Sequence, residues 1–175
     1  MSSQEEDTIL FYKFPVTEQK TKFSYALVNL KPIFPGHVLV CPLRNVPRLH
    51  DLREEECSDL FLAVQRVSRV IELEYSADSV NVAIQDGPLA GQTVPHVHVH
   101  IIPRRINDLP NVHDIYELLH DCGDDEDRKF QILKKNQNHD NFAEDGGPDG
   151  NAKVKNLART IEDMRTEANR LRKLF

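Results

Sequence analysis

The run H-V-H-V-H-I-I at residues 96–102 restricts the local fold more than any other part of the sequence. Side chains on a β-strand point alternately to opposite faces of the sheet. The pattern therefore places three imidazoles on one face and the β-branched residues between them on the other, and such residues favour extended backbone. Pro95 and Pro103 bracket the run and predict a strand of about seven residues.

Further strands and helices are predicted around this run. The long helix begins near Asp51, which forms a capping-box-like pair with Glu54. Its apolar face is formed by Cys57, Leu60, Phe61, Val64, Val67 and Ile71. A C-terminal helix is predicted from apolar residues at alternating steps of four and three, which are Leu157, Ile161, Met164, Ala168, Leu171 and Phe175. The remaining elements are strands at 9–14, 22–30, 37–41 and 79–84 and a short helix at 114–119.

These elements indicate one fold class. Short strands joined by tight turns, with one long helix between them, are typical of an α+β domain in which helices cover one face of an antiparallel sheet. A chain of 175 residues is long enough for one such domain with a hydrophobic core.

The segment 121–150 differs in composition from the rest of the chain. It holds nine acidic and four basic residues, a net charge of −5 out of the total of −6, and four of the seven glycines. Such a segment cannot bury enough apolar surface to fold alone, so we expect a mobile acidic insert, with an acidic binding tail as the alternative. The insert separates a folded domain at 1–120 from a C-terminal helix at 151–175 that packs on the same domain.

Composition also excludes several classes of protein. Outside the insert the charge is nearly balanced, which gives no basic footprint for nucleic acid. The apolar runs are too short to cross a bilayer, and the acidic start at residues 1–7 is unlike a secretory signal. Three cysteines without C-x-x-C spacing (Cys41, Cys57 and Cys122) favour a reduced, intracellular protein, which we expect in the cytoplasm, with the nucleus as a further compartment.

Three interpretations of His96, His98 and His100 are open from the residues alone. Two histidines two positions apart, together with His37, could hold zinc. Alternatively, one histidine is a nucleophile and the others stabilise an anion. The third interpretation is a solvated polar face of the sheet. Neutral imidazole attacks phosphorus well and its pKa lies near neutrality, which favours the second. His98, in the middle, has a neighbour on each side to support it.

The pattern His-φ-His-φ-His-φ-φ resembles the histidine triad superfamily. Two longer stretches resemble its Fhit branch, namely Q-D-G-P-L-A-G-Q-T-V-P-H-V-H-V-H-I-I-P-R at 85–104 and A-L-V-N-L-K-P-I-F-P-G-H-V-L-V-C-P-L-R at 26–44. Members of that branch hydrolyse dinucleoside polyphosphates, notably diadenosine triphosphate. Nucleoside phosphoramidate hydrolases share the triad but usually carry G-Q-S before it, where this chain has G-Q-T. The resemblance is close over 24–105 and loose in the C-terminal helix.

The resemblance implies a role for each matching residue. It implies that His98 attacks the α-phosphorus and carries the nucleotidyl group, that His96 and His100 contact the phosphate, and that His37 supports the site. It further implies a substrate-binding set of Asn29, Gln85, His100 and the phosphate loop Gly91, Gln92, Thr93 and Val94. Tyr116 matches a tyrosine that is phosphorylated in some members, whereas its plain alternative is a half-buried helix residue.

The resemblance also sets the expected partners. It implies that residues 1–120 are the catalytic domain, that diadenosine triphosphate yields AMP and ADP, and that a homodimer continues the sheet across its interface. A divalent cation, Mg²⁺ or Mn²⁺, would travel with the substrate phosphates, with no metal held by the protein and no organic cofactor. Nucleic acid and membrane are not expected partners. A phosphoramidate hydrolase, a zinc-dependent hydrolase and a nucleotide-binding signalling module with incidental activity are the alternatives.

The composition of the insert generates a first prediction. Replacing 121–150 with a short Gly/Ser linker should leave the fold intact, because a twofold change in loop length alters stability by only about 0.6 kcal/mol. Urea unfolding of the two proteins measures this, and loss of cooperative unfolding in the shortened protein would show that the segment packs on the domain.

Overall fold

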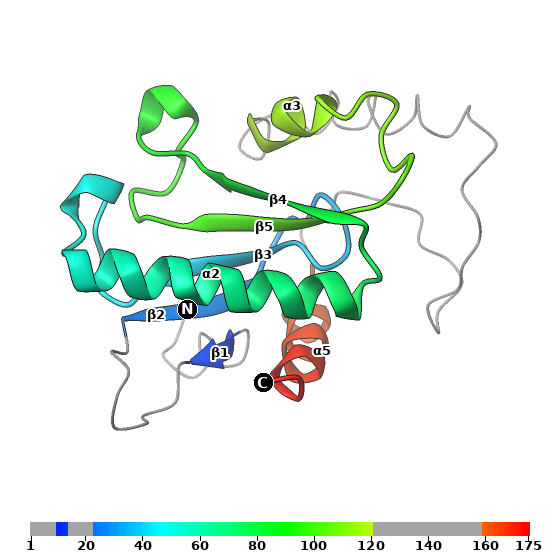
Figure 1. Cartoon of the computed structure of the whole chain (residues 1–175), viewed down its shortest axis with the longest axis horizontal. Coiled ribbons are helices and arrows are strands. Elements are labelled where there is room, and N and C mark those ends of the chain that lie inside the picture. Colours follow the sequence, from blue (N-terminus) through cyan, green and yellow to red (C-terminus); the bar gives the residue numbers. More distant parts are fainter. Residues whose placement is uncertain (1–9, 14–22, 121–158) are drawn as a thin grey trace.

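The computed structural model describes residues 10–13, 23–120 and 159–175, which form one antiparallel sheet with helices around it (Figure 1). The strands lie in the order β1-β2-β3-β5-β4. Their bounds are Leu10–Lys13 for β1, Ser24–Val28 for β2, Val38–Pro42 for β3, Ser79–Ile84 for β4 and Val99–Arg104 for β5. The helices are α2 at Glu54–Glu74, α3 at Asp114–His120 and α5 at Ile161–Arg172, with 3-10 turns η1 at Leu49–Asp51 and η2 at Pro88–Ala90. The α+β prediction is confirmed.

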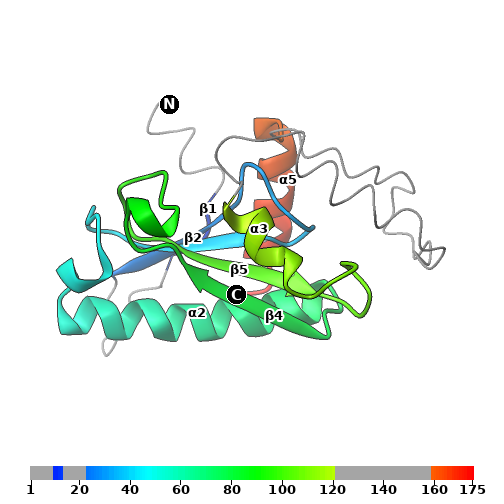
Figure 2. The ribbon, with the colours of Figure 1, turned by 90° about the horizontal axis from the view of Figure 1, so that it is seen from above.

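The larger core lies between one face of the sheet and the helices α2 and α5. Strand residues Ala26, Val28, Val38, Val40, Val99 and Ile101 are fully buried there. Helix α2 contributes Leu60, Ala63, Val64, Val67 and Ile71, and α5 contributes Met164, Ala168 and Leu171. In Figure 2, α5 runs crosswise to α2, and it contacts β1 and β2.

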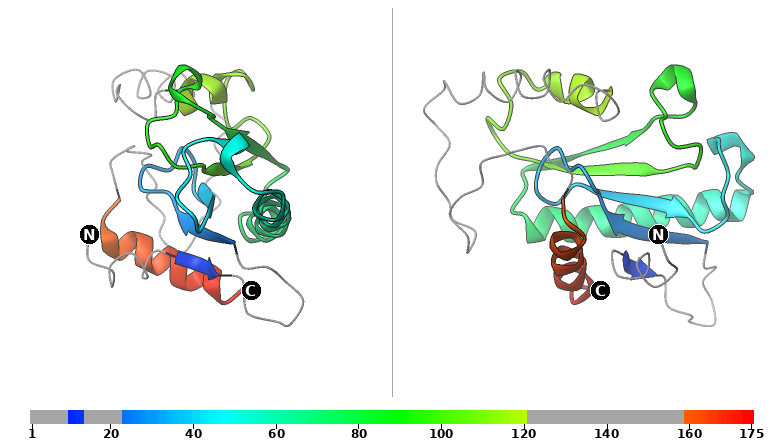
Figure 3. Two further views of the ribbon diagram at one scale, coloured as in Figure 1. Left: turned by 90° about the vertical axis from the view of Figure 1, so that its left-hand side faces the viewer. Right: turned by 180° about the vertical axis from the view of Figure 1, so that it is seen from behind.

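A second, smaller core lies on the opposite face of the sheet. It contains Ile102 of β5 together with Ile33, Leu109, Ile115, Leu118 and Leu119. Figure 3 shows α3 and α2 on different sides of the strands. The expectation that helices cover only one face is therefore wrong, because Ile102 follows Ile101 in the strand and gives the second face an apolar patch that α3 covers.

The histidine segment keeps the predicted alternation but not the predicted strand. Val97 is buried with Val99 and Ile101 in the larger core, while His100 lies on the other face opposite Leu39 of β3. Strand β5 begins only at Val99, and Pro103 lies inside it. Pro103 is tolerated because β3 pairs with β5 only as far as Ile101, so this part of β5 has one neighbouring strand, paired as Val80 with Pro103.

The start of the long helix differs from the prediction. Residues 49–51 form a 3-10 turn, and α2 begins at Glu54 with Arg53 as its N-cap. The carboxylate of Glu56 accepts hydrogen bonds from the Arg53 backbone N–H at 2.9 Å and from Arg44 at 2.6 and 2.8 Å. Arg44 and Arg53 hold the pKa of this buried carboxyl below its ordinary value. Glu56, not Asp51, therefore fixes the first turn.

Only some of the remaining predictions fall on residues that the structure describes. The insert at 121–150 and Cys122 lie outside them, whereas Cys41 and Cys57 are free thiols. The C-terminal helix is confirmed at 161–172, where Thr160 accepts the Asp163 backbone N–H at 3.1 Å as its N-cap. None of the described helices has the length and apolar character needed to cross a membrane.

Candidate active site

Strand pairing brings four histidines to one place. His37 immediately precedes β3, His100 lies in β5 opposite Leu39, and His96 and His98 lie in the segment that leads into β5. The ring centroids of His37 and His100 are 5.2 Å apart, and those of His98 and His100 are 5.0 Å apart. The rings of His37, His98 and His100 are thus neighbours, on the face of the sheet opposite α2.

A chain of hydrogen bonds fixes the protons of two of these rings. The backbone N–H of Ile33 donates to His37 Nδ1 at 3.1 Å, so that nitrogen carries no proton. In neutral His37 the proton is therefore on Nε2, which lies 2.9 Å from His100 Nδ1 and donates to it. The proton of neutral His100 must then be on its Nε2. One backbone amide thus sets the tautomers of two imidazoles.

His100 presents this proton as a donor within the site. Its side chain is 5% exposed, and its Nε2 has no hydrogen-bond partner among the described residues. Burial, with a smaller contribution from His98, lowers the pKa of His100 from 6.5 to about 4. A buried donor without a protein acceptor suits a ligand oxygen, because leaving such a group unpaired costs free energy.

His98 has the opposite arrangement of its ring nitrogens. Its Nδ1 lies 2.7 Å from the backbone carbonyl oxygen of His96. Because a carbonyl only accepts, Nδ1 carries the proton, and the lone pair of the neutral ring is on Nε2. The ring is half-buried. This is the form of imidazole that can attack phosphorus while its other nitrogen stays bonded to a fixed acceptor.

His96 is held separately from the other two. Its Nδ1 accepts the Val46 backbone N–H at 3.4 Å, a long bond, and burial lowers the pKa of the half-buried ring. Its backbone carbonyl orients His98. The three histidines of the motif therefore have different environments, although their spacing in the sequence is uniform.

The predicted phosphate loop is anchored by Gln92. The Gln92 side-chain oxygen accepts the Gly87 backbone N–H at 3.0 Å, and its nitrogen donates to the Pro47 carbonyl at 2.8 Å. The same nitrogen lies 3.4 Å from the His96 carbonyl that orients His98. In this structure the Gln92 amide holds the loop together, while Thr93 and Val94 are exposed.

Gln85 and Gly91 lie against each other beside α3. Gly91 has a φ of +88°, and a Cβ on it would lie 2.8 Å from the Gln85 side-chain nitrogen, so glycine is needed there. Gln85 donates to the Leu119 carbonyl at 3.3 Å. The structure therefore places this expected substrate-binding residue between the loop and the end of α3.

Asn29 touches His37 directly. Its side-chain nitrogen lies 3.1 Å from Nε2 and 3.3 Å from Nδ1 of His37, and of these two only the unprotonated Nδ1 can accept its N–H. The sequence resemblance assigns it to the substrate but gives no sign of this contact. Ile33, whose amide sets the tautomer of His37, was not predicted either, because a backbone donor leaves no signature in residue type.

Tyr116 lies on α3 and is 60% exposed. Its ring stacks on His113, with centroids 6.4 Å apart. The alternative of a half-buried helix residue is therefore wrong, and the phosphorylation site stays a prediction. No set of three or more His, Cys, Asp or Glu side chains in the described part of the chain is arranged to hold a metal ion.

Comparison with known proteins identifies the family. Residues 15–107 match the model of the HIT domain. A bifunctional bis(5'-adenosyl)-triphosphatase/adenylylsulfatase FHIT of Arabidopsis thaliana is 44% identical over 155 residues, covering 89% of this chain and 75% of the plant protein. A bis(5'-adenosyl)-triphosphatase of Dictyostelium discoideum is 51% identical over 115 residues, covering 66% of this chain and 76% of its own length. The crystal structure of the C. elegans NitFhit protein superposes with a TM-score of 0.63 at 32% identity, over 96% of this chain and 27% of that one.

The chain belongs to the HIT family, because the family model matches more than half of its length. The names of these relatives confirm the resemblance to the Fhit branch.

The buried neutral ring of His100 generates a prediction about pH. Its folded-state pKa of about 4 lies below the ordinary 6.5, so as pH falls the unfolded chain takes up this proton first. The part of the free energy of unfolding that depends on the neutral His100 ring is fully present above pH 6.5. It is lost as the pH falls toward 4, and the loss amounts to about 3 kcal/mol. Between pH 7 and 4, the free energy of unfolding of the wild type should therefore fall by about that much more than that of His100→Asn.

Urea titrations at several pH values measure these differences. The variant His50→Asn, at a side chain that is 69% exposed and lies 3.3 Å from Asp51, is the control for the loss of a histidine outside the buried site. Equal slopes for wild type and His100→Asn would contradict the neutral buried ring.

Proposed function

We propose that this chain hydrolyses dinucleoside polyphosphates, with diadenosine triphosphate cleaved to AMP and ADP through a nucleotidyl group on His98. The observation that carries the proposal is the bond from His98 Nδ1 to the His96 carbonyl, which leaves Nε2 unprotonated. The names of the relatives from Arabidopsis and Dictyostelium support the substrate class.

In the first step, the Nε2 lone pair of His98 attacks the α-phosphorus. The bond between that phosphorus and the oxygen bridging to the β-phosphate breaks, and ADP leaves with the bonding electrons. The ring becomes a cation, which the His96 carbonyl stabilises through Nδ1–H. The Nε2–H of His100 is available to a phosphate oxygen on which charge develops.

In the second step, water attacks the same phosphorus and the phosphorus–nitrogen bond breaks. AMP is released, His98 regains its lone pair, and the water proton passes to solvent. The sum is one dinucleotide and one water converted to AMP and ADP. A divalent ion, Mg²⁺ or Mn²⁺, enters as part of the substrate, where it offsets the charge of the phosphates and of the leaving ADP.

We also propose that the chain acts as a homodimer. Strand β4 is an edge of the sheet and, within the described residues, pairs only with β5. Its Val82 is 47% exposed. A second copy would pair with this edge and extend the sheet, and exposed strand edges favour such association.

The central prediction concerns His98→Asn, which removes the nucleophile and keeps a polar side chain. Turnover of diadenosine triphosphate should fall by about 10³-fold or more, while binding of the dinucleotide persists. Intact-mass spectrometry of wild type denatured at alkaline pH during turnover, where a phosphorus–nitrogen bond to histidine survives, should show an added AMP that the variant lacks, and His50→Asn should behave as wild type. Near-wild-type turnover in His98→Asn would end the assignment.

Two further outcomes separate the alternatives. A clear preference for an adenosine phosphoramidate would keep the nucleophile and change the leaving group. Zinc bound by the histidines at about one ion per chain, with turnover lost on chelation and restored by zinc, would replace the nucleophilic mechanism.

The dimer proposal generates a separate prediction about β4. Val82→Lys places two like charges near each other in the paired edges and should shift the protein to a monomer in sedimentation experiments. Leu73→Lys, on α2 at an equally apolar side chain that is 82% exposed, is the matched control. A wild type that sediments as a monomer would overturn the proposal.

A further inference from the structure

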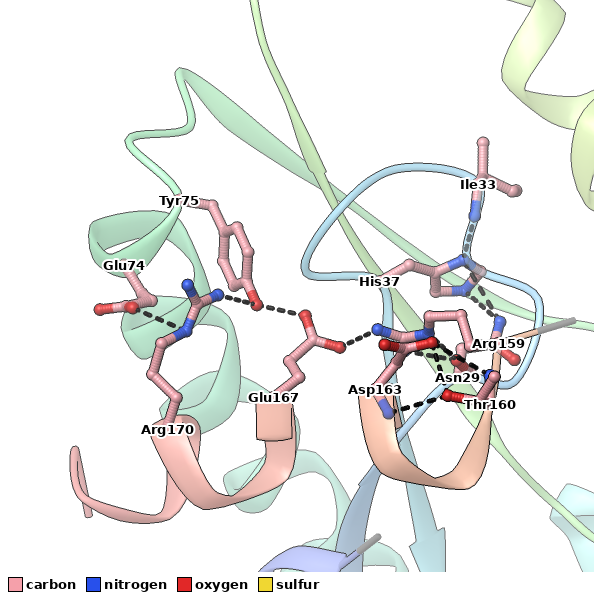
Figure 4. Close-up of polar contacts among 10 residues, drawn as sticks. All are labelled: Asn29, Ile33, His37, Glu74, Tyr75, Arg159, Thr160, Asp163, Glu167 and Arg170. Carbon is pink, nitrogen blue, oxygen red and sulfur yellow. Dashed lines mark hydrogen bonds and ion pairs between the residues drawn. The ribbon is translucent and has the colours of Figure 1, made fainter. Parts of the chain in front are cut away.

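The loop between β2 and β3, which contains groups that contact or belong to the histidines of the site, is held in place by Arg159 near the C-terminal helix α5. This β2–β3 loop, residues 29–37, contains Asn29, the Ile33 amide and His37. Arg159, just before α5, donates to the Asn29 carbonyl through Nε at 3.2 Å and Nη2 at 2.5 Å (Figure 4). Its backbone N–H donates to the Leu30 carbonyl at 3.0 Å. One arginine thus fixes the first two residues of the loop.

Glu167 connects this arginine to the end of α2. One oxygen of its carboxylate pairs with Arg159 Nη1, and the other accepts the Tyr75 hydroxyl (Figure 4). The Arg159 and Glu167 side chains are 19% and 10% exposed. Burial, together with the charge of Glu167, raises the pKa of the Tyr75 hydroxyl, so it stays protonated and donates. Arg170 completes the arrangement by donating to the Tyr75 oxygen at 2.7 Å.

The ring of Tyr75 packs on the other end of the loop. Gly36, the residue before His37, has a φ of +87°, and a Cβ there would lie 2.6 Å from the Tyr75 ring. The ring therefore lies where any side chain at this position would be. Arg159 holds the start of the loop, Tyr75 holds its end, and Glu167 joins the two.

We propose that Arg159, Glu167 and Tyr75, here called the polar clamp, are positioning residues for the reaction at His98. By fixing both ends of the β2–β3 loop, the clamp keeps the Ile33 amide on His37 Nδ1. It thereby keeps the protons of His37 and His100 on Nε2 and the His100 donor turned toward the reacting phosphate. This inference deepens the proposed function and rests on it for its catalytic part.

The chemistry of Glu167 offers a nearly isosteric way to break the clamp. A carboxylate accepts from Arg159 and Tyr75 at once, whereas a glutamine amide has one accepting oxygen and one donating nitrogen. Arg159 can only donate, so it takes the oxygen of the amide. The amide nitrogen is then left facing the Tyr75 hydroxyl, whose oxygen already accepts from Arg170. Glu167→Gln should therefore leave the Tyr75 O–H without its acceptor and remove the charge partner of Arg159.

The matched control lies on the same helix. Glu162→Gln makes the same chemical change in α5, at a side chain that is 75% exposed and paired with Arg165. Neither residue of that pair contacts the loop in the described interactions. Tyr75→Phe is the second test variant, since it removes the hydroxyl and keeps the ring on Gly36.

The experiment measures imidazole ¹⁵N shifts of the full chain without substrate, and kcat with diadenosine triphosphate. In the wild type and Glu162→Gln, His37 and His100 should each carry their proton on Nε2. In Glu167→Gln and Tyr75→Phe, His100 should sample both tautomers and kcat should fall, by up to about 100-fold in Glu167→Gln, as for a displaced catalytic group.

The outcomes separate the two proposals. Unchanged tautomers in folded Glu167→Gln would overturn the clamp, and so would changed tautomers with an unchanged kcat. If Glu167→Gln does not fold, Tyr75→Phe decides by the same two measurements. If the wild type does not cleave the dinucleotide at all, the proposed function fails, and the ¹⁵N shifts alone decide whether the clamp sets the tautomers.

Discussion

The hydrogen bond from the Ile33 amide to His37 Nδ1 is the constraint on which the site depends. Neutral imidazole can carry its proton on either nitrogen, and the two tautomers lie close in energy in water. A backbone amide can only donate, so it excludes one tautomer of His37, and His37 in turn excludes one tautomer of His100. The tautomers of His37 and His100 are therefore both fixed by the Ile33 amide, which can only donate.

The same logic explains why the histidines must be buried to different extents. His100 is removed from water and stays neutral, so it can donate from Nε2 without placing a positive charge beside His98. His98 is half-buried and remains reachable by a bulky anionic substrate. This difference in burial arises within a few residues of one segment. Val97, Val99 and Ile101 anchor that segment in the larger core, while the histidine rings project from the other face.

Much of the architecture could be predicted from the sequence, because alternation and turn residues are local signals. Both ends of β4 were predicted correctly. The burial of Val97 and Val99 on the same face of the sheet followed from the alternation of side chains along a strand. The roles of Gln92 and Asn29 toward protein groups could not be predicted, since their partners Pro47 and His37 are chosen by the fold. The start of α2 was missed because the decisive contact of Glu56 is with Arg44, twelve residues away.

The sequence separation of 130 residues between Asn29 and Arg159 has a consequence for how the protein is made. A ribosome adding about 5–20 residues each second delivers the loop and the catalytic strand first, and Arg159 on the order of ten seconds after Asn29. During that interval the nascent domain can already pair its central strands, because β2, β3, β4 and β5 have all emerged. The central strands and their histidines can therefore be assembled before Arg159 is made, and on the clamp proposed above their final alignment waits for the segment that carries Arg159 and α5.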